Sequence, residues 1–485
     1  MLGISEDETF ENALKSAEAS AEQMNIVYQA STPDEYINTM VNIWLKRQIS
    51  LDKTWGRVYS KGFRDIMQDV AALISFGKDI GAQKIINCLE HQRYNGNPLR
   101  AFEPINYENY HDGAVWIPAT VLVYIKETGD ASILDRKCAY FDNESRETVL
   151  EHIIKGIRFL LDNRGKNDMV LWGGGDWNDS INNAGNKLIG ESAWLSIAAV
   201  KAIKEFCEIL RIKGDCEDLI SSLTAEKEEL KAAIIKTAFE NDRFIYGIND
   251  WGEKIGSKES KQSKIFLNTQ TWAVLADILD KDGCEKLMDT VEREHKCEYG
   301  YVQCSPAYSA PDEHIGRVAY FIPGGYENGS VYNHGVAFKI AADCKLGRND
   351  LAFKALKMIG FDNPDNPNSG VEPYAVSNMY LDPEEAYRKG FAPCSWITGT
   401  AGWLYRNITE SILGITAEFS GLKISLWLPS KWNNVTVSPI YRGATYYISI
   451  KKTGAKSILV DGEKYDSDII PIFKVGTAHN VIYTF

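Results

Sequence analysis

Four segments of the chain share one pattern. Each has an apolar helical stretch, a turn built on Gly or Asp, and a second helical stretch that opens with small or apolar residues. They occupy residues 73–89, 123–135, 275–289 and 341–359. The repeat is too loose for a strict solenoid period. Amphipathic helices bury their apolar faces against neighbouring helices, so the pattern favours stacked helical hairpins that close into an α/α toroid, a mainly α fold.

The patterning changes after Gly414, where short segments with alternating apolar residues begin, such as VTVSPIY and ATYYISIKK. Period-two alternation predicts strands, so residues 414–485 are expected to form a small antiparallel, β-sandwich-like domain. At the other end, residues 5–30 are rich in Ala and Glu and predict one amphipathic helix. A second helix over 34–50 is expected after the cap at Ser31–Asp34. The predicted domains are a linker helix region (1–32), a helical barrel (33–413) and the β-domain.

Composition excludes several classes of protein. The chain has 485 residues and a net charge of −13, which argues against a general nucleic-acid binder, because a phosphate backbone requires a basic face. The longest mainly apolar uncharged stretch, residues 113–125, is too short to cross a bilayer, so no membrane association is expected. Nine cysteines without a CxxC pair predict reduced thiols, a cytoplasmic location and no metal site.

Four long loops interrupt the helical pattern, at residues 93–111, 170–190, 299–332 and 361–400. They are rich in Gly, Asn, Pro and aromatic residues, and loops of this length in a compact domain are usually functional. The chain contains 12 Trp, 24 Tyr and 18 Phe. Many of these rings belong to the core, but such a content also suits carbohydrate sites, where flat apolar sugar faces stack on rings.

The densest motif is LWGGGDWNDS at residues 171–180, where Asp176 and Asp179 flank Trp177. Its glycines allow the backbone to approach a ligand closely. A ring beside a carboxyl group offers a sugar platform and an acid whose pKa is raised by desolvation. The alternative interpretation is an Asx-rich turn that caps the helix from Glu191 and keeps both acids solvated.

A second polar motif interrupts an apolar pattern at residues 62–69. Arg64, Asp65, Gln68 and Asp69 recur on one face of a predicted helix. Carboxylate and guanidinium groups pair well with vicinal sugar hydroxyls, so this face is a candidate sugar site. A buried or surface cluster of salt bridges explains the pattern equally well.

Two further motifs lie before predicted helices. His334 follows the Gly/Asn-rich loop GGYENGSVYN, and Thr398 and Gly399 open the last predicted helix. Free N–H groups and the positive end of the helix dipole favour an anion there. A structural histidine and an ordinary Thr N-cap are the simpler interpretations of each motif alone.

Taken together and in this order, the motifs resemble those of glycoside hydrolase family 94, the inverting phosphorylases of β-linked disaccharides. The matching segments are GFRDxxQD (62–69), GDWND (175–179) with GES (190–192), ENGxxxxH (327–334), VEPY (371–374) and TGTAGW (398–403). The resemblance implies an (α/α)6 barrel followed by a small β-domain. It also implies functional roles for a set of residues: Asp179 as general acid; Asp65 and Trp177 in sugar binding, with Arg64, Glu327 and Glu372 in the same pocket; and His334, Thr398 and Gly399 in phosphate binding.

The implied reaction needs no cofactor, because inorganic phosphate is the co-substrate. Asp179 protonates the glycosidic oxygen, and phosphate attacks the anomeric carbon from the opposite face to give an α-sugar 1-phosphate. An inverting hydrolase requires a second carboxylate to activate water, whereas phosphate is already an anionic nucleophile. The implied partners are a β-linked sugar and either a second copy of the chain or a separate chain that supplies an N-terminal domain.

Three features depart from the family pattern. Relatives carry a large β-sandwich before the linker helix, and this chain begins at about that linker. Tyr59 stands where relatives have a phosphate-binding Arg, with Arg57 and Lys61 as possible substitutes, and Tyr326 stands where cellobiose-type members often have Lys. Two alternatives remain open from sequence: an inverting hydrolase with Asp179 as acid and a carboxylate such as Glu372 as base, and a non-catalytic subunit or glycan-binding scaffold.

Overall fold

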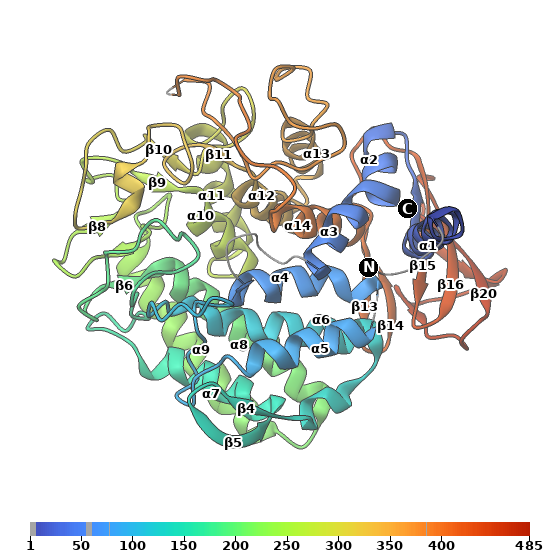
Figure 1. Cartoon of the computed structure of the whole chain (residues 1–485), viewed down its shortest axis with the longest axis horizontal. Helices are drawn as coiled ribbons and strands as arrows, with labels where there is room; N and C mark the ends of the chain where they lie inside the picture. Colours follow the sequence, from blue (N-terminus) through green and yellow to red (C-terminus); the bar gives the residue numbers. More distant parts are fainter. Residues whose placement is uncertain (1–5, 55–60, 77, 385) are drawn as a thin grey trace.

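Six helices form a closed ring in the computed structural model, which describes residues 6–54, 61–76, 78–384 and 386–485. Each packs against the next, and the last packs against the first. In chain order they are α4 (Phe63–Leu73), α6 (Trp116–Thr128), α8 (Ala193–Lys213), α10 (Leu267–Leu275), α12 (Asn333–Leu346) and α14 (Thr400–Arg406) (Figure 1). The π-helical segment η6 (Asn407–Ile412) continues α14 directly.

A second set of helices packs outside this ring. Each member contacts one or two ring helices. They are α3 (Leu45–Thr54), α5 (Lys78–Leu89), α7 (Val149–Asp162), α9 (Glu217–Ala238), α11 (Lys281–Glu294) and α13 (Asn349–Met358). Within the described residues the arrangement is an (α/α)6 barrel, which confirms the fold class predicted from the hairpin pattern and the motifs.

The two sets of helices differ in composition because they differ in burial. Most residues of α12 are buried, and its charged Lys339 and Asp343 pair with each other inside the protein. The outer helix α7 has one apolar face and begins at a capping box formed by Thr148 and Glu151. The predicted glycine turns also occur, since Gly129 ends α6 in the left-handed region at φ 74°. Among the described helices, none has both the length and the apolar character to cross a membrane.

Four ring helices begin directly after a two-residue strand. These strands pair with short strands from the connecting segments. Three of the partners, β3, β10 and β12, belong to the long loops and fix those loops over one end of the ring. The sets are β2 (Lys61–Gly62) with β3 (Ala101–Phe102), β6 (Glu191–Ser192) with β7 (Gly247–Ile248) and β8 (Lys254–Ile255), β9 (Ile265–Phe266) with β10 (Cys304–Ser305), and β11 (Val331–Tyr332) with β12 (Met379–Tyr380). A separate hairpin, β4 (Lys137–Tyr140) and β5 (Asn143–Thr148), precedes α7.

The N-terminal segment differs from the single helix predicted over residues 5–30. Helix α1 (Glu6–Ile26) ends early, and β1 (Tyr28–Ser31) follows it and pairs with a C-terminal strand. Tyr28 and Ala30 are buried by this pairing, and that gain outweighs local helix propensity. The predicted cap is present, since Asp34 accepts a hydrogen bond from the Ile37 amide at the start of α2 (Glu35–Thr39), which η1 (Met40–Trp44) joins to α3.

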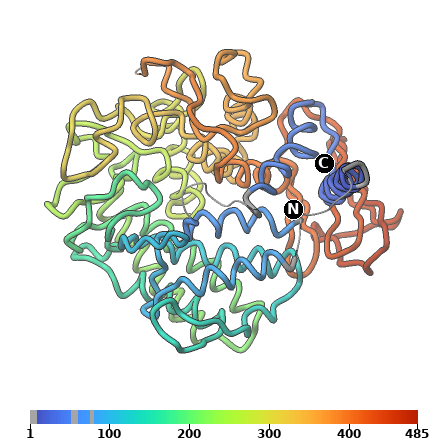
Figure 2. The backbone as a smooth tube through the Cα atoms, in the orientation of Figure 1, coloured from blue at the N-terminus to red at the C-terminus, as the bar shows by residue number. Residues whose placement is uncertain are grey.

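Beyond the barrel the chain forms two sheets. The larger has the order β1-β15-β16-β20-β17-β18, and the smaller has the order β13-β14-β19. All pairs are antiparallel except β16 with β20, which is parallel and departs from the fully antiparallel prediction. Figure 2 shows the N-terminal segment lying beside these C-terminal strands. The strands are β13 (Ile415–Glu418), β14 (Gly421–Ile424), β15 (Asn434–Tyr441), β16 (Ala444–Lys451), β17 (Ser457–Val460), β18 (Glu463–Lys464), β19 (Ile469–Pro471) and β20 (Ala478–Thr484).

The sheets contact the barrel at the C-terminal end of α6. The Tyr441 hydroxyl and the Arg442 guanidinium both donate to the Lys126 carbonyl, at 3.0 and 2.7 Å. Carbonyl groups at the end of a helix lack hydrogen-bond donors within the helix. The sheets supply donors for one of these carbonyl groups in α6. The opposite end of the ring, where the helices begin, is covered by the long loops.

Candidate active site

Asp179 lies between two arginines at the loop-covered end of the ring. Its Oδ1 atom is 2.5 Å from Nη2 of Arg64 and 3.2 Å from Nη2 of Arg100. Its backbone carbonyl accepts hydrogen bonds from the Tyr110 hydroxyl at 3.0 Å and from Arg317 at 2.8 Å. The carboxyl group of the GDWND motif is therefore fixed in direction, and about a third of the side chain is exposed to the site.

Arg64 is held in place by buried acceptors. Its Nη1 atom donates to Asp112 Oδ2 at 2.9 Å and to the Asp176 carbonyl at 2.6 Å. The Asp112 side chain is almost fully buried. A guanidinium that bridges two carboxylates and a carbonyl uses most of its donors, so Arg64 fixes the GDWND loop against the start of α4 and α6.

A cavity of about 80 Å³ opens beside this cluster. Arg64, Asp65, Arg100, Asp112 and Asp179 all line it. Gly62 precedes α4, and a Cβ atom on it would collide with the Asp65 carboxylate, which explains the glycine of the GFRD motif. The cavity therefore brings together three carboxylates and two guanidinium groups, which can bind the vicinal hydroxyls of a sugar.

Glu327 belongs to the same electrostatic cluster. Burial and, to a lesser extent, the nearby charge of Asp179 together raise the pKa of its carboxyl group to about 7. Glu327 in turn raises the pKa of Tyr332 beyond the effect of burial. Two acids that influence each other in this way do not both ionise easily, so Glu327 can hold a proton in the site near neutral pH.

Trp177 and His334 pack against each other. Their ring centroids are 5.3 Å apart with an edge-to-face orientation, and Tyr332 lies 5.8 Å from Trp177 in the same orientation. Gln68 Oε1 lies 3.1 Å from His334 Nε2 and accepts from Trp403 Nε1 at 2.9 Å. Because that oxygen is an acceptor, Nε2 of His334 carries the hydrogen.

Thr398 and Gly399 stand at the start of α14, as predicted. Gly399 is the N-cap residue, and the Thr398 hydroxyl donates to Asn378 Oδ1 at 2.9 Å. Asn378 also hydrogen-bonds the Tyr332 side chain. A continuous set of contacts therefore joins Thr398 through Asn378 and Tyr332 to Trp177.

The two acids of the GDWND motif have opposite pKa shifts. The expected acid with a raised pKa beside Trp177 is Asp176 and not Asp179. Burial raises the pKa of Asp176 to about 7. Burial also raises the pKa of Asp179, but the charges of Arg64 and Arg100 outweigh it, and the net pKa lies below its usual value. Asp176 is a supporting residue: its oxygens accept from the Tyr246 hydroxyl at 2.6 Å and the Ser192 hydroxyl at 2.7 Å.

Replacing Asp176 with Asn is expected to change how stability depends on pH. The folded protein keeps a proton on Asp176 up to about pH 7, whereas the unfolded chain releases it near pH 4. The free energy of unfolding of the wild type therefore falls between these values, by at most about 4 kcal/mol. Denaturant unfolding is measured from pH 5 to 8. The free energy of unfolding of the variant minus that of the wild type should rise with pH. Asp168→Asn, on an exposed loop, serves as the control, and a difference independent of pH would contradict the assignment.

Among the predicted site residues, Arg64, Asp65 and Asp179 line the Asp179 cavity, whereas Trp177, Glu327, Glu372, His334, Thr398 and Gly399 do not. Glu372 is exposed on the loop before α14, where its carboxylate accepts from the Ser395 hydroxyl, and it does not line the Asp179 cavity within the described residues. Tyr59 and Arg57 lie outside the described residues. Lys61 is described, and its ammonium group contacts Glu103.

Sequence reasoning missed Arg100, Arg317 and Tyr110. Arg100 contacts the acid and lies 4.6 Å above the Tyr110 ring, and Arg317 donates to the Asp179 carbonyl. All three belong to loops whose length and composition mark them as functional. The sequence signal for the two arginines was a basic residue inside a long loop. No regular spacing along the chain connects any of the three positions to Asp179.

The ring concentrates helix N-termini at this site. Arg64 and His334 are each the second residue of their helix, Asp112 opens a short 3-10 turn (η3, Asp112–Val115) before α6, and Ser192 caps α8. The positive ends of these helix dipoles add to the charges of Arg64 and Arg100. The site can therefore bind an anion next to a sugar. Among the described residues, no three His, Cys, Asp or Glu side chains gather to hold a metal ion.

Comparison with known proteins agrees with this geometry. The family model of the glycosyl hydrolase 94 superfamily, catalytic domain, matches residues 22–414. Among solved structures, a GH78 family rhamnosidase of Bacillus sp. GL1 aligns with a TM-score of 0.61 at 12% identity, covering 95% of this chain and 44% of its own. At that identity the likeness shows the fold alone.

Sequence relatives include several phosphorylases. The chain is 36% identical over 472 residues to a solabiose phosphorylase of Paenibacillus borealis, covering 96% of this chain and 61% of the relative. It is 27% identical over 494 residues to an N,N'-diacetylchitobiose phosphorylase of Vibrio proteolyticus, covering 92% and 60%. The chain thus spans about three fifths of the length of these relatives. By its motifs, its barrel and the family match, the chain belongs to the glycosyl hydrolase 94 superfamily.

Proposed function

We propose that the protein catalyses the reversible, inverting phosphorolysis of a β-linked disaccharide or oligosaccharide. The observation that carries the proposal is the set of neighbours of the GDWND loop: the Asp179 amide donates to the Trp177 carbonyl, and Trp177 contacts His334 directly and Thr398 through Tyr332 and Asn378. The relatives named above are phosphorylases, which supports the same reaction class.

In the proposed reaction Asp179 is the general acid, Asp65, Arg64, Trp177 and Glu327 bind the sugar that is cleaved, and His334, Thr398 and Gly399 bind phosphate. Phosphate oxygen forms a bond to the anomeric carbon as the bond to the glycosidic oxygen breaks. The leaving oxygen takes the proton of Asp179. Because two arginines hold Asp179 as a carboxylate in the free protein, it takes up this proton from solvent as the substrate binds. Hydrogen phosphate supplies the attacking oxygen, and the products are an α-sugar 1-phosphate and a free sugar.

The competing hydrolase would use a carboxylate such as Glu372 as its base, and the Glu372 carboxylate accepts from the Ser395 hydroxyl on an exposed loop. An inverting hydrolase places a base opposite the acid at a distance that admits water. A screen in the synthetic direction tests the phosphorylase: α-glucose, α-N-acetylglucosamine and α-mannose 1-phosphate are each mixed with a panel of sugar acceptors. Acceptor-dependent release of phosphate is expected. Donor hydrolysis without acceptor dependence would contradict the proposal.

Thr398→Val is expected to raise KM for phosphate about tenfold while changing KM for the sugar little. Valine keeps the shape but removes the hydroxyl that donates to Asn378. The measurement is initial-rate kinetics with each substrate varied in turn. Thr409→Val is the matched control, because its buried hydroxyl donates to the Tyr405 carbonyl in the last turn of α14. An increase confined to the sugar KM would show that the anion site lies elsewhere.

The proposed partners are the β-linked sugar, phosphate, and either a second copy of the chain or a separate chain that carries an N-terminal domain. The proposed location is the cytoplasm, supported by nine cysteines that are all free thiols. A binding-only scaffold is the competing function. Activity that appears only after addition of such a domain would identify the chain as a catalytic subunit, whereas glycan binding without turnover in any mixture would favour the scaffold.

A further inference from the structure

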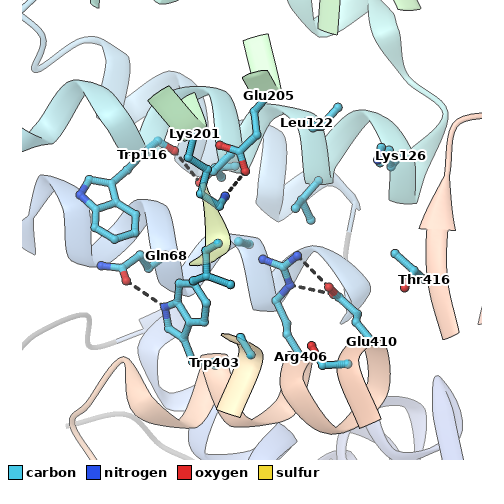
Figure 3. Close-up of a pocket in the computed structure, with 18 of the residues that line it drawn as sticks. Gln68, Trp116, Leu122, Lys126, Lys201, Glu205, Trp403, Arg406, Glu410 and Thr416 are labelled. Atoms are coloured by element: carbon cyan, nitrogen blue, oxygen red, sulfur yellow. Dashed lines mark hydrogen bonds and ion pairs between the residues drawn. The ribbon is translucent and has the colours of Figure 1, made fainter. Parts of the chain in front are cut away.

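A second, larger cavity runs along the axis of the barrel. Its volume is about 310 Å³, and residues from all six ring helices and from β13 line it. Figure 3 shows Trp116, Trp403 and Gln68 at one side of this space and the charged side chains of Lys201, Glu205, Arg406 and Glu410 around the rest. A cavity of this size in the middle of a barrel is large enough for a small organic molecule.

This axial cavity is separate from the Asp179 cavity. No described residue lines both of them. Gln68 and Trp403 stand between the two, because Gln68 lines the axial cavity while its Oε1 atom contacts His334 on the active-site side. A ligand in the axial cavity would therefore lie behind the site of the proposed reaction and would not compete for Asp179.

The charges of the axial cavity do not cancel. Each cation in its wall has a carboxylate partner: Lys126 pairs with Glu208 at 2.6 Å and Glu418 at 2.8 Å, Lys201 pairs with Glu205, and Arg406 pairs with Glu410 at 2.7 and 2.9 Å. One further carboxylate, Glu127, has no such cation. Within the described residues, no donor lies at hydrogen-bond distance from it. One negative charge is left without a direct partner in a mostly buried space.

Two features add to the negative potential around Glu127. The first is its own position in the last turn of α6. The second is the presence of two further helix C-terminal ends at the same cavity, those of α10 at Leu275 and of η6 at Ser411. The C-terminal ends of helices carry partial negative charge and favour cations. Burial raises the pKa of Glu127 to about 7, the charge of Glu410 adds to this, and Arg406 and Arg442 oppose it.

Aromatic walls complete the site. Trp116, Trp272 and Trp403 all line the axial cavity, and the Lys201 ammonium already lies 5.9 Å from the Trp272 ring centroid. Ring faces attract cations and accept apolar groups. A cavity lined both by a carboxylate without a direct cation partner and by tryptophan rings can hold an amine with an apolar body.

We propose that the axial cavity is a binding site for a small organic ammonium ion. Its charged group pairs with Glu127, and its apolar part lies toward the tryptophans. The volume exceeds what a bare metal ion fills, and the described residues offer no metal-ligand cluster. Entry is available at Glu208, whose side chain is 42% exposed and whose ion pair with Lys126 stands at the edge of the cavity.

Isothermal titration of the full chain with propylammonium chloride at about pH 8, where Glu127 is mainly ionised, tests the site. We expect a Kd of about 1 mM or tighter, with no comparable heat from 1-propanol or sodium propionate, which match the ligand in size. Glu127→Gln should weaken binding by at least about tenfold. It removes a buried charge, so the variant is expected to fold. Glu463→Gln, on an exposed strand, is the matched control.

Two more variants locate the ligand. Ala119→Leu narrows the axial cavity and should abolish binding, whereas Asp179→Asn should leave the Kd unchanged, because the two cavities share no lining residue in the part of the chain that the structure describes. The proposal is overturned if propylammonium does not bind the wild type, if 1-propanol binds equally well, or if Glu127→Gln and Ala119→Leu bind like the wild type. Loss of binding in Asp179→Asn would place the ligand in the active site and would also overturn it.

Discussion

Replacing Asp179 with Asn is expected to lower kcat/KM for phosphorolysis by about 10²- to 10⁴-fold, the range typical for loss of a general acid. Asparagine keeps the shape of the side chain and can still accept from Arg64 and Arg100, but it cannot deliver a proton to the leaving oxygen. Initial rates of sugar 1-phosphate formation measure the loss. Because the side chain is 36% exposed, circular dichroism and thermal unfolding should remain close to those of the wild type.

Glu108→Gln provides the control for this variant. Glu108 pairs with Arg100 at 2.8 Å from the exposed side, so the change perturbs the same arginine without touching the acid. It should keep most of the activity. If Asp179→Asn keeps wild-type kcat/KM, or if the two variants lose activity equally, Asp179 is not the proton donor.

Replacing Arg64 with Met is expected to destabilise the protein by about 3–5 kcal/mol, because it leaves the buried Asp112 carboxylate without its cation. The Arg64 and Asp112 side chains are 10% and 3% exposed, so solvent cannot replace the lost partner. Denaturant unfolding measures the change. Arg100→Met is the matched control. Arg100 is more exposed, and its partners are exposed carboxylates, so its loss should cost much less.

A second change separates the ion pair from packing. Asp112→Asn in the Arg64→Met background removes the stranded charge and should recover a large part of the lost stability. If the double variant is as unstable as Arg64→Met, the cost comes from lost packing of the guanidinium, and Arg64 does not hold the loop through its charge.

The sequence predicted elements whose signals are local. The hairpin turns needed only a glycine after an apolar helix, as at Gly129. The early end of α1 was not predicted, because the strand at Tyr28 exists through its pairing with β15, several hundred residues later in the chain. The parallel pairing of β16 with β20 is likewise set by tertiary order, since alternation alone does not indicate strand direction.

In the candidate site, too, residues in local motifs were predicted and residues brought in by tertiary structure were not. Motifs with fixed spacing predicted Asp179, Trp177 and His334 as candidate site residues. Arg100 and Arg317 contact Asp179 from loops that are distant in the sequence. The opposite pKa shifts of Asp176 and Asp179 were also beyond local sequence. They depend on which carboxylate meets the two arginines and which meets Tyr246 and Ser192. Glu127 lies in an ordinary helical turn in the sequence, and only the closed barrel gives it a cavity.

Phosphorus NMR of the full chain incubated with β-linked disaccharides, with and without inorganic phosphate, is the most direct test of the proposed activity. Consumption of phosphate and appearance of a sugar 1-phosphate with α configuration, together with no cleavage when phosphate is omitted, is the predicted result. Cleavage at the same rate without phosphate, or a sugar phosphate of β configuration, would contradict an acid at Asp179 acting opposite a bound phosphate nucleophile.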